Sequence, residues 1–116
     1  MRLIIFIVYG IFFLSTGAKA EDVYLNCVHE IKKQTTITLS YNAIRNTGEE
    51  YIGAGESIKY KLFLTNTDIS LENRSLDGKF RRWFINRFSG NSTLVDNWSG
   101  KIFEANYNCS TANKKF

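Results

Sequence analysis

The residues best suited to contact a ligand are concentrated in one segment, 79–88, which reads KFRRWFINRF. It holds four basic and four aromatic residues in ten positions. Arginine pairs with carboxylates and phosphates, and aromatic rings stack on sugars or bases, so the combination is typical of a binding surface. We expect the binding residues to be among Arg81, Arg82, Trp83 and Arg87.

The alternative for the same segment is structural. Read as a strand, it places aromatic and polar residues on both of its faces, so neither face is purely apolar. Arginine stems can cover apolar surface while the charged head stays in water. The segment could therefore be a long central strand with a bulge, with its aromatics in the core and its arginines in solvent.

Catalysis has little support in the sequence. His29 is the sole histidine, so a Ser-His-Asp arrangement would have to use it. No nucleophile-elbow, zinc-protease, Walker or dinucleotide-binding motif occurs. Scattered acids such as Glu50 and Glu72 could meet across strands as glycoside hydrolysis requires, but their spacing does not predict it. We predict a protein that is not an enzyme and has no cofactor and no metal site. A small hydrolase that uses His29 is the alternative.

The two cysteines, Cys27 and Cys109, have one possible pairing with each other. Both fall on the apolar side of an alternating segment, and two distant thiols with one histidine make a poor metal site. We predict a disulfide that joins the first strand to the last.

The first 20 residues have the features of a secretory signal peptide. Arg2 precedes an apolar run over 3–14, which is too short to cross a bilayer, and small residues at Ala18 and Ala20 suit a signal peptidase. We predict cleavage after Ala20, a single domain over 21–116, a periplasmic or secreted location and no stable membrane anchor after cleavage.

The charge balance gives weak support for a polyanion partner. The whole chain carries 15 basic and 11 acidic residues, a net charge of +4. Removal of Arg2 and Lys19 with the leader would leave 13 against 11, or +2. We therefore expect a protein or small-ligand partner and do not expect nucleic acid.

Apolar and polar residues alternate with a period of two through most of the remaining chain, which indicates strands. The clearest segments are 23–27, 35–41, 58–64, 68–72 and 103–109, and turn residues separate them at 46–48, 53–55, 77–78, 89–91 and 99–100. Such a pattern predicts an all-β fold, a small antiparallel meander of about seven or eight strands. A barrel-like form and a two-layer sandwich are both compatible with it, and a disulfide between the end strands favours the barrel.

Residues 85–90, which read INRFSG, and the later Cys109 near a Lys-Lys-Phe end carry a resemblance. The layout resembles a group of small exported bacterial proteins, mostly without an assigned function, which show an Asn/Asp-Arg-x-Ser/Thr-Gly hairpin and a late cysteine. The resemblance implies a periplasmic β-meander, supplies no catalytic residues, and implies that Arg87 anchors the turn at Ser89 and Gly90.

In size and class the chain is also similar to the c-type lysozyme inhibitors, which are small exported β-barrels with a disulfide. Residues 53–57 are only weakly similar to their inhibitory loop. The function that we expect is that of an exported, non-enzymatic β-domain that binds a partner at its surface or barrel mouth. An inhibitor of an envelope-directed hydrolase such as c-type lysozyme is an alternative.

Overall fold

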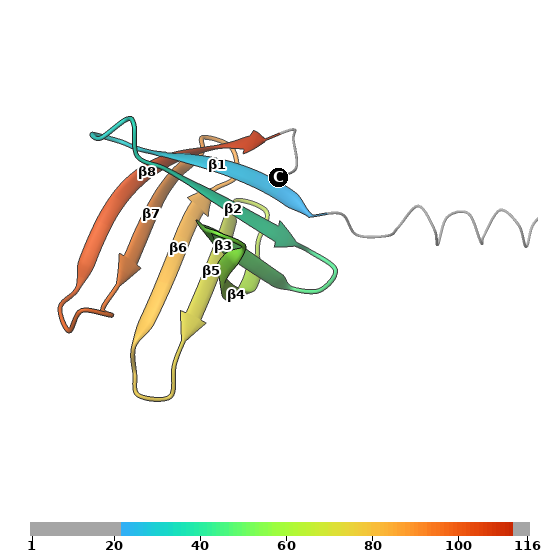
Figure 1. Ribbon diagram of the computed structural model, residues 1–116. Helices are drawn as coiled ribbons and strands as arrows, with labels where there is room; N and C mark the ends of the chain where they lie inside the picture. The colour runs from blue at the N-terminus through green and yellow to red at the C-terminus, as the bar shows by residue number, and fades with distance from the viewer. Residues whose placement is uncertain (1–21, 113–116) are drawn as a thin grey trace, which may run out of the picture.

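The computed structural model describes residues 22–112, which form eight antiparallel strands joined in chain order into a closed barrel (Figure 1). This confirms the all-β prediction and selects the barrel over the two-layer sandwich. The strands are β1 (Val23–His29), β2 (Thr36–Asn42), β3 (Thr47–Gly53), β4 (Glu56–Leu64), β5 (Asp68–Arg74), β6 (Phe80–Asn86), β7 (Asn91–Asp96) and β8 (Phe103–Ala112). The predicted leader, residues 1–20, lies outside the described residues.

Period-two alternation produces the barrel because it sends every second side chain inward. The interior is filled from all around the barrel by Leu25 of β1, Leu39 of β2, Leu71 of β5, Trp83 of β6 and Leu94 of β7, all buried. A barrel of this size has room for side chains and little more, so the core is solid near its middle.

Closure of the barrel depends on the pairing of β1 with β8, the two strands farthest apart in the described chain. Cys27 lies directly opposite Cys109 in this ladder, and the two sulfurs form a disulfide. The predicted bond is confirmed, and it crosses the seam where the sheet meets itself. A closed sheet has no free edge to pair with another chain.

The connections divide between two ends. We call the mouth the end formed by the β1–β2, β3–β4, β5–β6 and β7–β8 connections, that is residues 30–35, 54–55, 75–79 and 97–102. The opposite end holds the three remaining connections together with the start of β1 and the finish of β8, on the right of Figure 1.

Candidate functional site

The four binding candidates of segment 79–88 do not share one surface. β6 is a regular strand from Phe80 to Asn86, without the bulge that the structural alternative included. Arg81 and Trp83 point into the barrel, whereas Arg82 lies on its outside and Arg87 follows the strand in the β6–β7 turn. The aromatics also separate, because Trp83 is fully buried and Phe84 is exposed.

Arg81 is the centre of an ion-pair network inside the barrel. Its Nε and Nη2 donate to the two carboxylate oxygens of Glu50 at 3.0 and 2.8 Å, and its Nη1 donates to Asp96 at 2.5 Å. Tyr60 and Trp83 donate to the same Glu50 oxygen, Oε1, at 2.5 and 3.0 Å. The network therefore ties β3, β4, β6 and β7 together, and every carboxylate charge in it faces the guanidinium.

The environment of Glu50 favours its charged form. Burial raises the pKa of this carboxyl, but the hydrogen bonds from Arg81, Tyr60 and Trp83 outweigh burial and leave the pKa below its ordinary value. For Tyr60, burial and the neighbouring Glu50 carboxylate raise the pKa well above its usual range. An ionised Glu50 beside a neutral Tyr60 makes a stable structural network and not an acid–base pair poised near neutral pH.

Acid should destabilise the barrel by protonating Glu50. A carboxyl whose pKa is lower in the folded than in the unfolded state gives stability that is complete above about pH 4.3 and is lost as the pH falls through the folded value. We expect Glu50→Gln to lower the free energy of unfolding at pH 7 by about 2 kcal/mol and to flatten its decrease below about pH 4. Urea unfolding from pH 7 to pH 3 measures both effects.

Glu49→Gln is the matched control, because Glu49 is adjacent in the chain but lies outside the barrel, where it pairs with Lys59 at 3.2 Å. Its variant should keep the acid sensitivity of the parent. An unchanged acid profile in Glu50→Gln would contradict the assignment of that sensitivity to Glu50.

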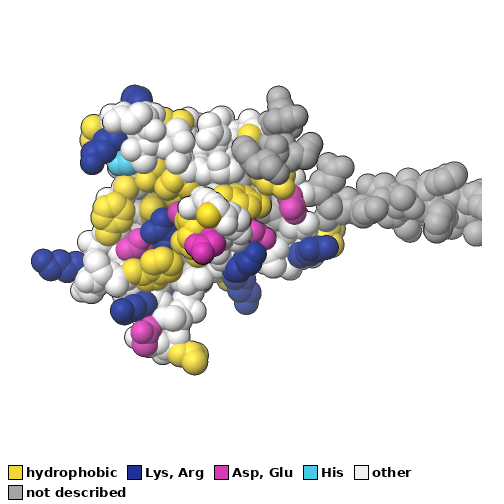
Figure 2. All heavy atoms as spheres, viewed as in Figure 1, with side chains coloured by type: hydrophobic (Ala, Val, Ile, Leu, Met, Phe, Trp, Pro, Cys, Tyr) yellow, Lys and Arg dark blue, Asp and Glu magenta, His cyan; other side chains and the backbone are white. Residues whose placement is uncertain are grey.

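The mouth carries an unusual number of exposed apolar side chains. Of the ten large hydrophobic residues that are exposed among those described, six lie on it or at the strand ends that border it. We call these six the rim: Ile31, Ile52, Leu76, Trp98, Ile102 and Phe103. Figure 2 shows hydrophobic side chains gathered across the middle of this face, with charged side chains of both signs among them.

Two features show that the surface of the rim is not flat. Trp98 lies over the Arg81 guanidinium, 5.4 Å from the ring centre, so the network forms the floor beneath it. A pocket of about 210 Å³ lies between the β1–β2 connection and the start of β8, and Ile31 and Phe103 both line it. The rim is therefore not flat, and it could receive a protruding side chain.

His29 also lies near the mouth. Its Nδ1 accepts hydrogen bonds from the backbone amides of Ile31 and Lys32 at 3.1 and 3.0 Å, and its ring packs edge-on against Tyr107. Within residues 22–112, no carboxylate or hydroxyl group is hydrogen-bonded to His29. The histidine thus shapes the β1–β2 turn.

The motif that carried the resemblance forms one structural unit at the opposite end. The Asn86 side chain accepts hydrogen bonds from the amides of Phe88 and Ser89, and the Cys109 amide donates to the Gly90 carbonyl at 2.8 Å. A Cβ on Gly90 would lie 2.2 Å from the Cys109 carbonyl oxygen, and its φ is +81°, so glycine is required on both grounds.

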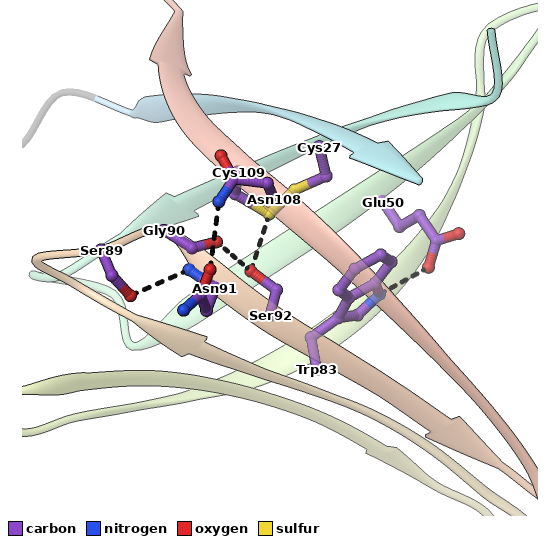
Figure 3. Close-up of a disulfide and its surroundings, with 9 residues drawn as sticks. All are labelled: Cys27, Glu50, Trp83, Ser89, Gly90, Asn91, Ser92, Asn108 and Cys109. Atoms are coloured by element: carbon purple, nitrogen blue, oxygen red, sulfur yellow. Dashed lines mark hydrogen bonds between the residues drawn. A yellow bond between two sulfur atoms is a disulfide. The ribbon is translucent and has the colours of Figure 1, made fainter. Parts of the chain in front are cut away.

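The disulfide takes part in this unit (Figure 3). The Ser92 hydroxyl lies within hydrogen-bonding distance of the Gly90 carbonyl oxygen, at 2.8 Å, and of Cys109 Sγ, at 3.0 Å. Arg87 reaches the neighbouring turn, where its Nη1 donates to the Thr65 carbonyl at 2.7 Å. The hairpin and the late cysteine are therefore in contact.

The same unit borders an open pocket of about 450 Å³ at the opposite end, lined by Asn86, Arg87, Ser89, Cys109 and Thr111 among others. Asn86 Oδ1, Arg87 Nη1 and Ser89 Oγ are engaged in turn contacts. This pocket consequently has fewer polar groups free for a ligand than its lining suggests.

Neither metal chemistry nor a membrane helix appears in the described part of the chain. Residues 22–112 contain no group of three or more His, Cys, Asp or Glu side chains that could hold a metal ion. No helix in that range is long and apolar enough to span a bilayer.

No protein-family model, curated protein or solved structure matches this chain.

Proposed function

We propose that the protein is an exported, non-enzymatic binding domain whose mouth contacts a partner protein. The observation that carries the proposal is the rim, in which four separate connections and their strand ends present apolar side chains to solvent. Several exposed apolar side chains at one end of a small protein are typical of an interaction site.

The composition of the rim favours a protein over a polyanion. Interface centres are enriched in aromatic and aliphatic anchors, and the rim supplies Trp98 and Phe103. The mouth connections carry charges of both signs, with Lys32, Lys33, Lys79 and Lys101 against Glu30 and Asp77. A surface of mixed charge complements another protein better than it complements a chain of phosphates.

The proposed location rests on the leader-like first 20 residues together with the disulfide. A disulfide is compatible with an oxidising compartment such as the periplasm or the extracellular space. The proposal that the domain is not an enzyme draws support from the use of Glu50, Asp96 and His29 in structural contacts.

Photo-crosslinking in the native host tests the mouth. With a photoreactive residue at Ile102, we expect a covalent adduct with a distinct partner protein. With the same residue at Ile44, which is 68% exposed at the opposite end, we expect none. Adducts at both positions, or at neither, would argue against the mouth as the contact surface, and an adduct with a second copy would make the occupant this chain itself.

Inhibition of a c-type lysozyme is the specific form of the proposal that can be measured directly. A turbidity assay with cell-wall substrate should show protection by the wild-type protein, loss of protection in Ile102→Asp and retention in Ile44→Asp. Absence of protection at excess protein removes lysozyme as the partner.

A further inference from the structure

The outside of the barrel carries a second feature that is independent of the mouth. Across β4, β5 and β6, strand register places a Phe–Ser–Phe row beside a Lys–Glu–Arg row. We call these two rows the outer face. They consist of Phe63, Ser70 and Phe84, and of Lys61, Glu72 and Arg82.

The first row places an aromatic residue on either side of a small one, and we call the position over Ser70 between the two rings the slot. Phe63 and Phe84 are 46% and 43% exposed although both lie within the sheet and not in a turn. They stand on strands that flank β5, so about 10 Å separates their backbones, and the short Ser70 side chain lies between them. This backbone spacing is wide enough for one six-membered ring between two phenyl rings that stand upright on the sheet.

The second row supplies charge along one edge of the slot. The Lys61 ammonium lies 5.5 Å from the Phe63 ring centre, and the Arg82 guanidinium lies 5.7 Å from that of Phe84. A cation therefore lies two residues from each ring on the same strand, although the Arg82 guanidinium is nearer to the Phe80 ring, at 4.7 Å, than to that of Phe84.

These cations are only partly neutralised. Glu72 lies between them but pairs with Arg74 at 2.8 Å, whereas its distance from Arg82 Nε is 3.9 Å. Arg82 Nε has no hydrogen-bond acceptor among the described residues. Lys61 has no ion pair in that range, so the edge of the slot retains net positive charge.

We propose that the outer face binds an acidic saccharide, with one pyranose ring in the slot between Phe63 and Phe84. The C–H faces of the sugar would pack on the phenyl rings, and Lys61 and Arg82 would pair with the sugar carboxylate. Glu72 and Ser70 would hydrogen-bond to the hydroxyl groups.

Glu72 is the reason for choosing a saccharide over a nucleic acid. The Glu72 carboxylate repels phosphates and sugar carboxylates alike, but a saccharide also offers it several hydroxyl donors, and this favours the saccharide. Single-strand binders also depend on a strongly basic groove, whereas the cations here alternate with acids.

An NMR titration of the oxidised protein with a short hexuronate oligosaccharide tests the proposal. We expect amide shifts confined to β4–β6 and an affinity that falls at least about tenfold in Phe63→Ala/Phe84→Ala. Ser70→Phe fills the slot without removing a ring and should also abolish binding. Phe88→Ala removes an exposed ring at the opposite end and should leave the affinity unchanged.

A second titration, with a neutral oligosaccharide of equal length, tests the contribution of charge. The acidic sugar should bind more tightly, and Lys61→Gln/Arg82→Gln should remove that preference. No binding of the hexuronate at millimolar concentration, or binding that survives both Phe63→Ala/Phe84→Ala and Ser70→Phe, overturns the proposal. Tighter binding of a single-stranded oligonucleotide in the same slot would overturn the choice of ligand.

Discussion

Arg81→Met is expected to lower the free energy of unfolding by about 3–5 kcal/mol, a large part of the stability of a small domain. The Arg81 side chain is only 15% exposed, and it is the cation that both Glu50 and Asp96 contact. Methionine fills similar space but leaves two buried carboxylates without a counter-charge. Urea unfolding at neutral pH, followed by tryptophan fluorescence, measures the loss.

Arg82→Met is the control for this prediction. Arg82 is the next residue, but its side chain lies on the outer face, so we expect a loss of at most about 1 kcal/mol. Arg81→Lys keeps the charge and loses the two-carboxylate fork, so an intermediate effect is expected. Equal stability of Arg81→Met and Arg82→Met would contradict the structural importance of the network.

Loss of the disulfide should have an effect of similar size. Cys27 and Cys109 are 82 residues apart, and closing so long a loop restricts the unfolded chain strongly. We expect Cys27→Ala/Cys109→Ala to lose about 2–5 kcal/mol and to melt at a clearly lower temperature. Thermal unfolding with and without reductant measures the effect.

The double variant also serves as the control, because reductant should not change its melting temperature. Both sulfurs of the parent are buried, so its reduction under native conditions should be slow and limited by local opening. Rapid reduction without loss of stability would show that the bond is dispensable for the barrel.

The fold could be predicted from the sequence wherever apolar and polar residues alternate along a strand. Leu25 and Cys27 at one end of the chain, and Tyr107 and Cys109 at the other, alternate clearly, and this pattern predicted the strands that carry the disulfide. Strand β3 has no such signal, because two of its inward residues are Gly48 and Glu50. Glycine is needed at 48 since a Cβ there would lie 2.5 Å from a Leu71 methyl carbon.

The ion-pair network could not be predicted from local pattern. Alternation already placed Arg81 on the same strand face as Trp83 and Ile85. The positive charge of Arg81, however, suggested a solvent-exposed contact residue. Its partners are 31 and 15 residues away, on β3 and β7, and only closure of the barrel brings them together. The signal that was available is Glu50. It is an acidic residue on the inward face of β3, and no basic residue of that strand shares its face.

The rim and the outer face also depend on closure. Ile31, Leu76 and Ile102 come from three different connections, and nothing in their spacing shows that they meet at one end. The Phe–Ser–Phe row depends on the register between three strands, which a single sequence does not fix.

The meander has a practical consequence for handling the molecule. Val23 and Ala112, the first residue of β1 and the last residue of β8, are both remote from the mouth (Figure 1). A fusion tag or surface tether attached next to either of these two residues would therefore leave the hairpin tips of the mouth pointing outward. Immobilised in this orientation, the barrel displays the rim for biosensor measurements without chemical coupling through its lysines.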